Sequence, residues 1–154
     1  MNGPPSAVPP IDLAALRSLF LSYSRDPDDS LIAKACQFAD RAHAGQRRVS
    51  GEPYIRHPVE VAFILAEHRF DATTLASALL HDVIEDCGVT EDDLRAEFGE
   101  EIALIVSGVT KISSISEQTR RETQAENLRK MLVAIARDIR VLLIKLADRL
   151  HNMR

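Results

Sequence analysis

The 154-residue chain is predicted to be an all-α domain of about eight helices. Apolar residues recur at the three- and four-residue spacing of helices along most of the chain. No stretch of useful length alternates between apolar and polar residues; residues 106–112 come nearest, and Gly108 interrupts them. The composition, 45% hydrophobic and 27% charged, is typical of a globular domain, and a chain of this length can bury a core.

Start signals in the sequence set the boundaries of several predicted helices. Capping-type residues precede the second, fourth and fifth helices, at 28–30, Asp71 and Thr90, and Asp93 follows Thr90 by three residues. Pro58 suits the first turn of the third helix. The predicted helices cover residues 11–23, 29–44, 58–68, 72–86, 91–97, 100–107, 121–136 and 138–154. The polar segment 45–56 is left as a loop of the kind that often carries binding residues.

The two ends of the chain are read differently from the rest. Residues 1–10 hold four of the seven prolines and are expected to form a disordered leader. Residues 11–154 are expected to form one domain. The sequence stops at Arg154 inside the last predicted helix, without a C-cap signal, so we expect the chain to be the truncated front of a longer protein.

Composition also limits the possible partners and location. A formal net charge of −4, with no large basic stripe, argues against broad nucleic-acid binding. No apolar run has transmembrane length, and the first residues lack the features of a signal peptide, so no membrane partner is expected. The two cysteines, Cys36 and Cys87, lack CxxC spacing and fit a reduced cytoplasmic protein.

The most informative pair in the chain is His81 and Asp82, which stand side by side in the segment LLHDVIED at 79–86. In a helix, both side chains could lean towards one ion, while Glu85 and Asp86 would lie one turn further along, over the same pair. An imidazole and a carboxylate are metal ligands, and nearby carboxylates suit acid–base work. Taken alone, however, such a dipeptide is more often an N-cap, a buried hydrogen-bonded pair or a coincidence.

Two further residues complete a candidate ligand set. His57 stands before Pro58, at the start of a predicted helix, and Asp148 is the single acid in an apolar helical run. Burying Asp148 is costly unless it is paired or bound to metal. With His81 and Asp82, these residues offer two nitrogens and two oxygens from three helices. The simpler interpretation of Asp148 is a surface salt bridge to a neighbouring basic residue, Lys145 or Arg149.

The remaining histidines receive plainer interpretations. His68 and His43 end predicted helices and are expected to be surface residues or to interact with the helix C-terminus, with a minor supporting role for His43. His151 follows Asp148 by three residues and could either support the site or simply pack. Arg48 could bind a phosphate or stack on a base, or be a solvated loop residue.

Four motifs occur in the order and with the spacing of one enzyme family. They are HAGQRRVSGEPYIRHP at 43–58, LHDVIED at 80–86, GVTK at 108–111 and IKLADRLHNMR at 144–154. On these motifs, residues 28–154 closely resemble the N-terminal hydrolase domain of the long Rel/SpoT proteins, a branch of the HD phosphohydrolase superfamily. The segment AENLRKM at 125–131 is similar to that of the long bifunctional enzymes rather than the small stand-alone hydrolases.

The resemblance implies an HD-domain helical bundle with a metal site between its helices. It also implies a manganese-dependent (Mn2+) hydrolase that removes the 3′-diphosphate of guanosine tetra- and pentaphosphate (ppGpp and pppGpp) as pyrophosphate, and that is joined to a synthetase domain in the full-length protein. The implied metal ligands are His57, His81, Asp82 and Asp148; the implied catalytic pair is Glu85 and Asp86; the implied nucleotide-binding residues are Arg48, Ser50 and Asn152.

The sequence departs from the family pattern in two places, at position 49 and at its end, Arg154, beyond which family members continue, and two rival interpretations stay open. Val49 stands where many relatives carry a lysine, which changes one wall of the implied nucleotide pocket. The first rival is an HD phosphohydrolase for another nucleotide. The second is a truncated domain that binds nucleotide or a regulatory partner without turnover. A mixed imidazole and carboxylate set suits manganese, iron or zinc, so the choice of manganese comes from the resemblance alone.

Overall fold

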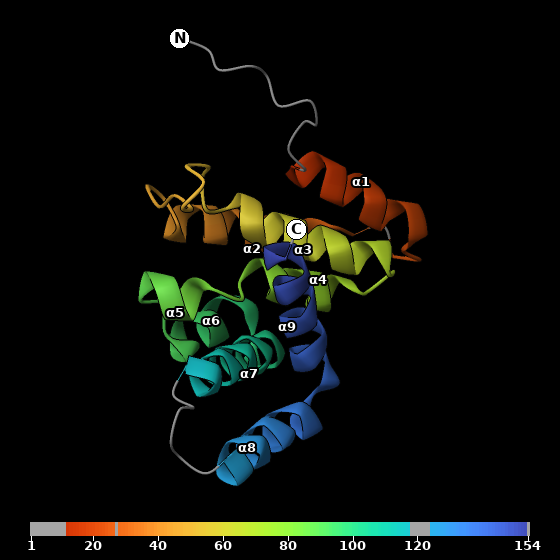
Figure 1. The fold of residues 1–154 in the computed structure, drawn as a ribbon. Coiled ribbons are helices and arrows are strands. Elements are labelled where there is room, and N and C mark those ends of the chain that lie inside the picture. The colour runs from red at the N-terminus through yellow and green to blue at the C-terminus, as the bar shows by residue number, and fades with distance from the viewer. Residues whose placement is uncertain (1–11, 27, 118–123, 154) are drawn as a thin grey trace.

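The computed structural model describes residues 12–26, 28–117 and 124–153, and within them the chain is all-α, as predicted. Nine helices are described, with one isolated antiparallel bridge between Arg47 and Pro53 (Figure 1). The helices are α1 (Leu13–Tyr23), α2 (Ser30–Ala42), α3 (Arg56–Glu67), α4 (Ala72–Leu79), α5 (Val83–Cys87), α6 (Glu91–Phe98), α7 (Glu100–Glu117), α8 (Gln124–Arg137) and α9 (Ile139–Asn152). The predicted leader, residues 1–10, lies outside the described residues. Among the described helices, none is long and apolar enough to cross a membrane.

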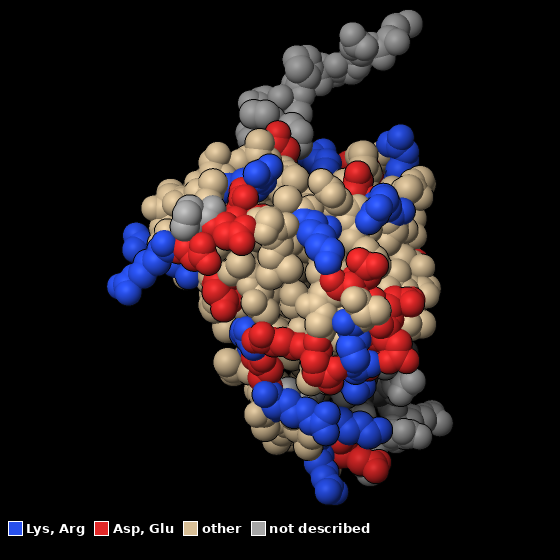
Figure 2. All heavy atoms as spheres, turned by 180° about the vertical axis from the view of Figure 1, so that it is seen from behind, with Lys and Arg blue, Asp and Glu red and all other residues tan. Residues whose placement is uncertain are grey.

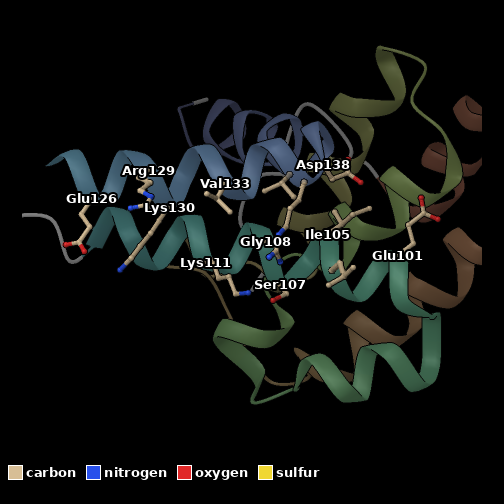
Figure 3. Close-up of a pocket in the computed structure, with 13 residues that line it drawn as sticks. Glu101, Ile105, Ser107, Gly108, Lys111, Glu126, Arg129, Lys130, Val133 and Asp138 are labelled. Carbon is tan, nitrogen blue, oxygen red and sulfur yellow. The ribbon is translucent and has the colours of Figure 1, made fainter. Parts of the chain in front are cut away.

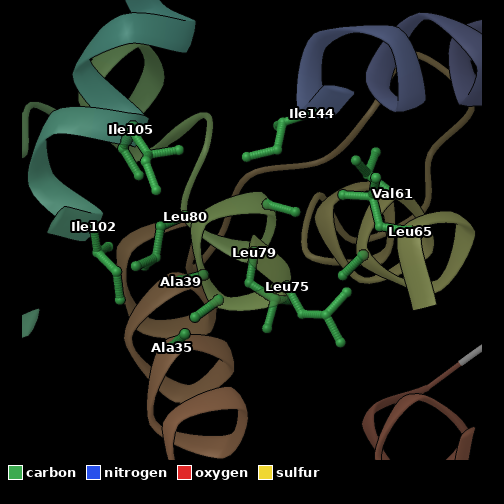
Figure 4. Close-up of a cluster of buried hydrophobic side chains, with 14 of the residues drawn as sticks. Ala35, Ala39, Val61, Leu65, Leu75, Leu79, Leu80, Ile102, Ile105 and Ile144 are labelled. Atoms are coloured by element: carbon green, nitrogen blue, oxygen red, sulfur yellow. The ribbon is translucent and has the colours of Figure 1, made fainter. Parts of the chain in front are cut away.

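Helix α4 is the centre of the bundle. Every residue from Thr74 to Leu79 is buried, and α4 packs against α2, α3, α7 and α9. Figure 4 shows leucines of α4 surrounded by alanines of α2 and by β-branched and leucine side chains of the other helices. A helix that is buried around nearly its whole circumference belongs in the core, and each fully buried leucine contributes about 1.5–3 kcal/mol relative to an exposed one. The rigid core therefore fixes the C-terminal end of α4.

The prediction of one helix over residues 72–86 was wrong, because α4 ends at Leu79 and α5 begins at Val83. The backbone N–H groups of His81 and Val83 bond three residues back, to Ala78 and Leu80, so the chain tightens into a turn. The His81 ring donates from Nδ1 to the same Ala78 carbonyl at 2.5 Å and occupies the acceptor that a continuing helix would offer to Asp82. A side chain thus makes the break, and the sequence has no glycine or proline there to signal it.

Helix α7 is longer than predicted and runs through Gly108 to Glu117. In the sequence, Gly108 follows the predicted helix 100–107 and interrupts the nearest strand-like pattern. In the structure it lies where α7 crosses α9, and a Cβ atom placed on Gly108 would come within 2.8 Å of Val141 Cγ2. This glycine is required by the close approach of two helices, which brings α9 and its acid, Asp148, towards the core.

The predicted start signals are largely confirmed. Asp71 accepts a hydrogen bond from the Thr74 backbone at 3.0 Å, and Thr90 and Asp93 form a complete capping box. Before α2, Asp29 is the cap residue without a side-chain cap bond. Helix α3 begins two residues before Pro58, so His57 lies inside its first turn.

Candidate metal centre and adjoining cavity

Three buried side chains from distant parts of the chain converge beside the end of α4. They are His57 in the first turn of α3, His81 in the turn between α4 and α5, and Asp148 on α9. Asp148 Oδ1 lies 2.6 Å from His57 Nε2 and 3.4 Å from His81 Nε2, and these ligand-type atoms all lie within 4.8 Å of one another. The three residues are 2–6% exposed. We call this set the His–His–Asp cluster.

His81 has the strongest signature of a ligand. Since its Nδ1 donates to the Ala78 carbonyl, the lone pair of the neutral ring lies on Nε2. That atom is buried and has no hydrogen-bond partner among the described residues, although Asp82 Oδ2 is 3.1 Å away. Burial lowers the pKa of His81, but the charges of Asp82 and Asp148 outweigh it and raise the pKa to about 10. Without metal, His81 is therefore protonated, and a cation bound at Nε2 would replace that proton.

His57 is oriented through its second nitrogen. Its Nδ1 lies 2.6 Å from His151 Nδ1, and His151 Nε2 contacts the carboxylate of Glu60. If His57 Nε2 is to bind metal, its Nδ1 must carry the proton and donate it to His151, whose own proton then faces Glu60. Chains of this kind fix the tautomer and ring direction of metal-binding histidines. Burial lowers the pKa of His57 despite the opposing effect of Asp148, which favours the neutral, ligating ring.

Asp148 uses its two oxygens in different ways. Oδ1 faces His57 and His81, while Oδ2 accepts a hydrogen bond from Lys145 Nζ at 3.0 Å. The ion pair expected in the simpler interpretation thus exists, but it is not a surface pair, because Asp148 is only 6% exposed. Burial acts to raise the pKa of Asp148, but its hydrogen bonds to His57 and His81 prevail and hold the pKa well below its usual range.

Asp82 lies at the edge of the cluster, nearer to solvent. Its Oδ2 is 3.1 Å from His81 Nε2 and 3.8 Å from His57 Nε2. Burial acts to raise the pKa of Asp82, but His81 outweighs it and the pKa falls to about 2. The ionised carboxylate therefore lies within reach of both imidazoles. Glu85 and Asp86 follow on the exposed side of α5.

A cavity of about 740 Å³ adjoins the cluster and is lined by all three expected nucleotide-binding residues. Its lining is Arg47, Arg48, Val49, Ser50, Glu52, Tyr54, His151 and Asn152. Arg48 Nη2 donates to Asn152 Oδ1 at 2.9 Å, and Asn152 Nδ2 lies 3.4 Å from Asp148 Oδ1. A contact path of two hydrogen bonds thus joins the cavity to the His–His–Asp cluster.

Sequence reasoning missed Tyr54 and Glu60 and misjudged His43. The Tyr54 hydroxyl contacts Asp82 and Asp86, and no spacing rule links a loop tyrosine to residues so far along the chain. Glu60 lies three residues after His57 in α3, and this helical spacing could have identified it. His43 is buried rather than on the surface, with its ring stacked on Tyr54 at 4.6 Å. His68 is exposed at the end of α3, as predicted.

The residues present fit a divalent metal ion. Two imidazole nitrogens and a carboxylate oxygen converge, a second carboxylate lies beside them, and one of the nitrogens is buried without a partner among the described residues. The nitrogen and oxygen donors suit manganese, iron or zinc.

Comparison with known proteins agrees with this geometry. The HD domain family matches residues 35–154. The chain is 53% identical over 140 residues to the guanosine-3′,5′-bis(diphosphate) 3′-pyrophosphohydrolase of Vibrio cholerae, and 50% identical over 140 residues to the bifunctional (p)ppGpp synthase/hydrolase SpoT of Escherichia coli K12. Each match covers 91% of this chain and 20% of the relative. The chain thus spans about a fifth of the length of these curated relatives.

A solved structure also matches the fold. It belongs to a metazoan ortholog of SpoT that hydrolyses ppGpp, and it superposes with a TM-score of 0.65 at 33% sequence identity. The match covers 85% of this chain and 72% of that chain. At this identity and coverage the likeness extends to the family as well as to the fold.

Proposed function

The chain belongs to the HD domain family and to its Rel/SpoT branch, and on that premise we propose that it hydrolyses guanosine 3′,5′-bis(diphosphate) and its pentaphosphate to GDP or GTP and pyrophosphate. The observation that carries the proposal is the buried His–His–Asp cluster, which lies beside a cavity holding Arg48. Relatives that share about half of its sequence are named for this reaction.

The proposed ligands are His57, His81, Asp82 and Asp148, and the proposed ion is manganese. A bound divalent ion would screen the diphosphate charge, orient the ester and lower the pKa of a coordinated water molecule. His81 and Asp148 contribute a lone pair and a charge from a rigid core, since both are buried against helices. Lys145 and the Glu60–His151 pair hold the ligands in orientation from behind.

The remaining roles fall to α5 and to groups around the cavity. Glu85 and Asp86, in the short helix α5 that follows Asp82, are proposed to orient the attacking water and accept its proton. Arg48 offers a planar guanidinium to phosphate or base, and its bond to Asn152 holds it at the cavity wall. Ser50 is exposed at the same wall, where it donates to Glu52 at 3.2 Å.

The test is release of pyrophosphate from guanosine tetraphosphate by the 154-residue chain, with manganese and with chelator. Manganese-dependent release of one pyrophosphate per nucleotide would support the proposal. A panel of ordinary nucleoside phosphates in the same assay separates the first rival, since faster turnover of any of them would point to a different nucleotide. Metal binding without turnover of any substrate would favour a non-catalytic nucleotide-binding domain.

Two wider roles belong to the same proposal. Relatives about five times longer include a synthase/hydrolase, so we place this chain next to a synthetase domain in its full-length protein. We also propose a cytoplasmic location and a part in the stringent response, because relatives that share about half of its sequence are named for the hydrolysis or synthesis of (p)ppGpp. Both cysteines are free thiols, which fits a reducing compartment.

A further inference from the structure

One phenol hydroxyl bridges the two carboxylates at the open side of the candidate metal centre. Tyr54 Oη lies 2.9 Å from Asp82 Oδ2 and 3.1 Å from Asp86 Oδ2. The first carboxylate belongs to a proposed metal ligand and the second to the proposed catalytic pair. Tyr54 itself lies in the loop between α2 and α3, far from both in the sequence.

The Tyr54 ring is held in place by its own surroundings. It stacks on the ring of His43, which is 3% exposed, with centroids 4.6 Å apart and an interplanar angle of 27°. The Tyr54 backbone N–H donates to the Gln46 carbonyl at 3.1 Å, and the Gln46 side chain donates to the Asp86 carbonyl at 3.2 Å. The loop and the C-terminal end of α5 are thus tied together, and the hydroxyl cannot swing away without disturbing this stack.

The hydroxyl carries one proton, so it donates to one of its two acceptors at a time. A carboxylate that ligates a cation has less negative charge to offer and is the weaker acceptor. Before metal binds, the hydroxyl can donate to Asp82 and hold its carboxylate beside the two imidazoles; once Asp82 binds metal, the proton is drawn towards Asp86. A hydrogen bond to an ionised carboxylate is stronger and more directional than one between neutral groups, so it can fix the direction of an exposed side chain.

We propose that Tyr54 is a positioning residue, which holds Asp82 in its ligating orientation and directs Asp86 towards the reacting water. The second half of this inference rests on the proposed function; the first half concerns metal binding alone. The hydroxyl acts through the two carboxylates, and the aromatic ring supplies the rigid support.

The test compares Tyr54→Phe with Tyr23→Phe. Each substitution removes one hydroxyl from a half-buried ring, and the Tyr23 hydroxyl donates to the Phe70 carbonyl, away from the site. We expect Tyr54→Phe to weaken Mn2+ binding about 10-fold, measured from the electron paramagnetic resonance signal of free Mn2+, because outer contacts of metal ligands typically have effects of this size. We expect kcat to fall about 10-fold while KM changes less than 2-fold. Tyr23→Phe should leave all three quantities unchanged.

A double-mutant cycle examines the path through Asp86. If Tyr54 acts on the reaction through this carboxylate, Tyr54→Phe should reduce kcat less than 2-fold further in an Asp86→Asn background. Full multiplication of the two effects would overturn that part of the proposal. A rise in KM alone would also overturn it, since the hydroxyl would then be a nucleotide contact.

The role of Tyr54 in holding Asp82 can be tested even if the proposed hydrolysis is wrong. If the unaltered chain releases no pyrophosphate, the proposed function fails, and the Mn2+ titration still decides whether Tyr54 holds Asp82. Unchanged Mn2+ affinity in Tyr54→Phe, with the thermal midpoint of the protein retained, would overturn the positioning role.

Discussion

The molecule contains a cavity and a groove of similar volume, and the side chains that line them differ in how firmly they are held. The cavity beside the His–His–Asp cluster measures about 740 Å³, and the groove between α7 and α8 measures about 670 Å³ (Figure 3). The first is bounded by side chains that bond to one another and to buried groups, such as Arg48 to Asn152 and Asn152 to Asp148. The second has an apolar floor and charged side chains along its rim.

The groove has more charged side chains than the cavity, but its basic ones are not held by ion pairs within the described residues. Its basic side chains, Lys111, Arg129, Lys130 and Arg137, are exposed and form no ion pair with any residue in the described part of the chain. Figure 2 shows basic side chains gathered along the end of the molecule formed by α8, beside a band of acidic ones. Two of the acids at the groove, Glu101 and Asp138, pair with Arg140 instead.

The difference teaches that volume and charge do not locate the chemistry in this fold. Reactive sites need groups that are held in place before the substrate arrives, and holding requires burial and mutual contact. The cluster meets this requirement because buried helices hold its residues: His57 lies in the first turn of α3, His81 directly after α4, and Asp148 within α9. The basic side chains of the groove are long and solvated, and no ion pair within the described residues fixes their directions.

The largest expected effect comes from removing a ligand. Asp82→Ala should abolish both Mn2+ binding and pyrophosphate release, because the carboxylate is within reach of both imidazoles while its partial exposure lets the fold tolerate the change. Metal content and activity are measured on the same sample. Lys130→Ala in the groove is the comparison and should change neither quantity by more than 2-fold. Retained stoichiometric metal in Asp82→Ala would refute its assignment as a ligand.

The next effect separates the ligands from the proposed base. Glu85→Gln keeps the size of the side chain and removes its basicity, so bound Mn2+ should remain while kcat falls about 10²-fold or more. Single-turnover kinetics with saturating metal measure the chemical step. An unchanged rate would transfer the role of base to Asp86 or to solvent.

A smaller effect compares arginines from the cavity and the groove. Arg48→Ala should raise KM about 10-fold with kcat within 3-fold, because a guanidinium at the cavity wall contributes mainly to binding the nucleotide. Arg129→Ala removes the same kind of charge from the groove rim and should leave KM unchanged. Equal effects of both substitutions would mean that the net charge of the surface, rather than the site, attracts the substrate.

The last expected effect is of a different kind and concerns stability against pH in the metal-free protein. The pKa of His81 is raised to about 10 by Asp82 and Asp148, in spite of burial, whereas an unfolded histidine has a pKa near 6.5. The stabilisation from protonated His81 is therefore complete below pH 6.5 and is lost progressively as pH rises towards 10. With chelator present, the free energy of unfolding should fall from pH 7 to pH 9, and His81→Gln should flatten this slope. The same slope in both proteins would show that His81 is not responsible.

The helical fold could be predicted because its signals are local. Asp71 caps α4 through the neighbouring backbone, and the apolar spacing of α9 places Ile144 in the core while it carries Asp148 inward. The break at His81 could not be predicted, since it depends on a ring nitrogen taking a backbone acceptor. The length of α7 was underestimated for a related reason: the small size of Gly108 serves a contact with Val141, which lies far away in sequence.

The same division applies to the site. Residue types and motif resemblance indicated His57, His81, Asp82 and Asp148, and the structure brings these four residues together. The residues that hold them were less visible. Tyr54 reaches Asp82 and Asp86 only after the loop between α2 and α3 folds back, which is a tertiary event without a sequence period. Support of this kind becomes visible only when the segments are assembled.

The most direct test of metal-dependent hydrolysis at the His–His–Asp cluster is a titration of the metal-free chain with Mn2+. Bound metal and pyrophosphate release from guanosine tetraphosphate are followed together. We predict that activity rises in proportion to bound Mn2+ and stops increasing at one ion per chain. Release that persists in excess chelator, or that bears no relation to metal bound at the cluster, would contradict the proposed metal-dependent mechanism.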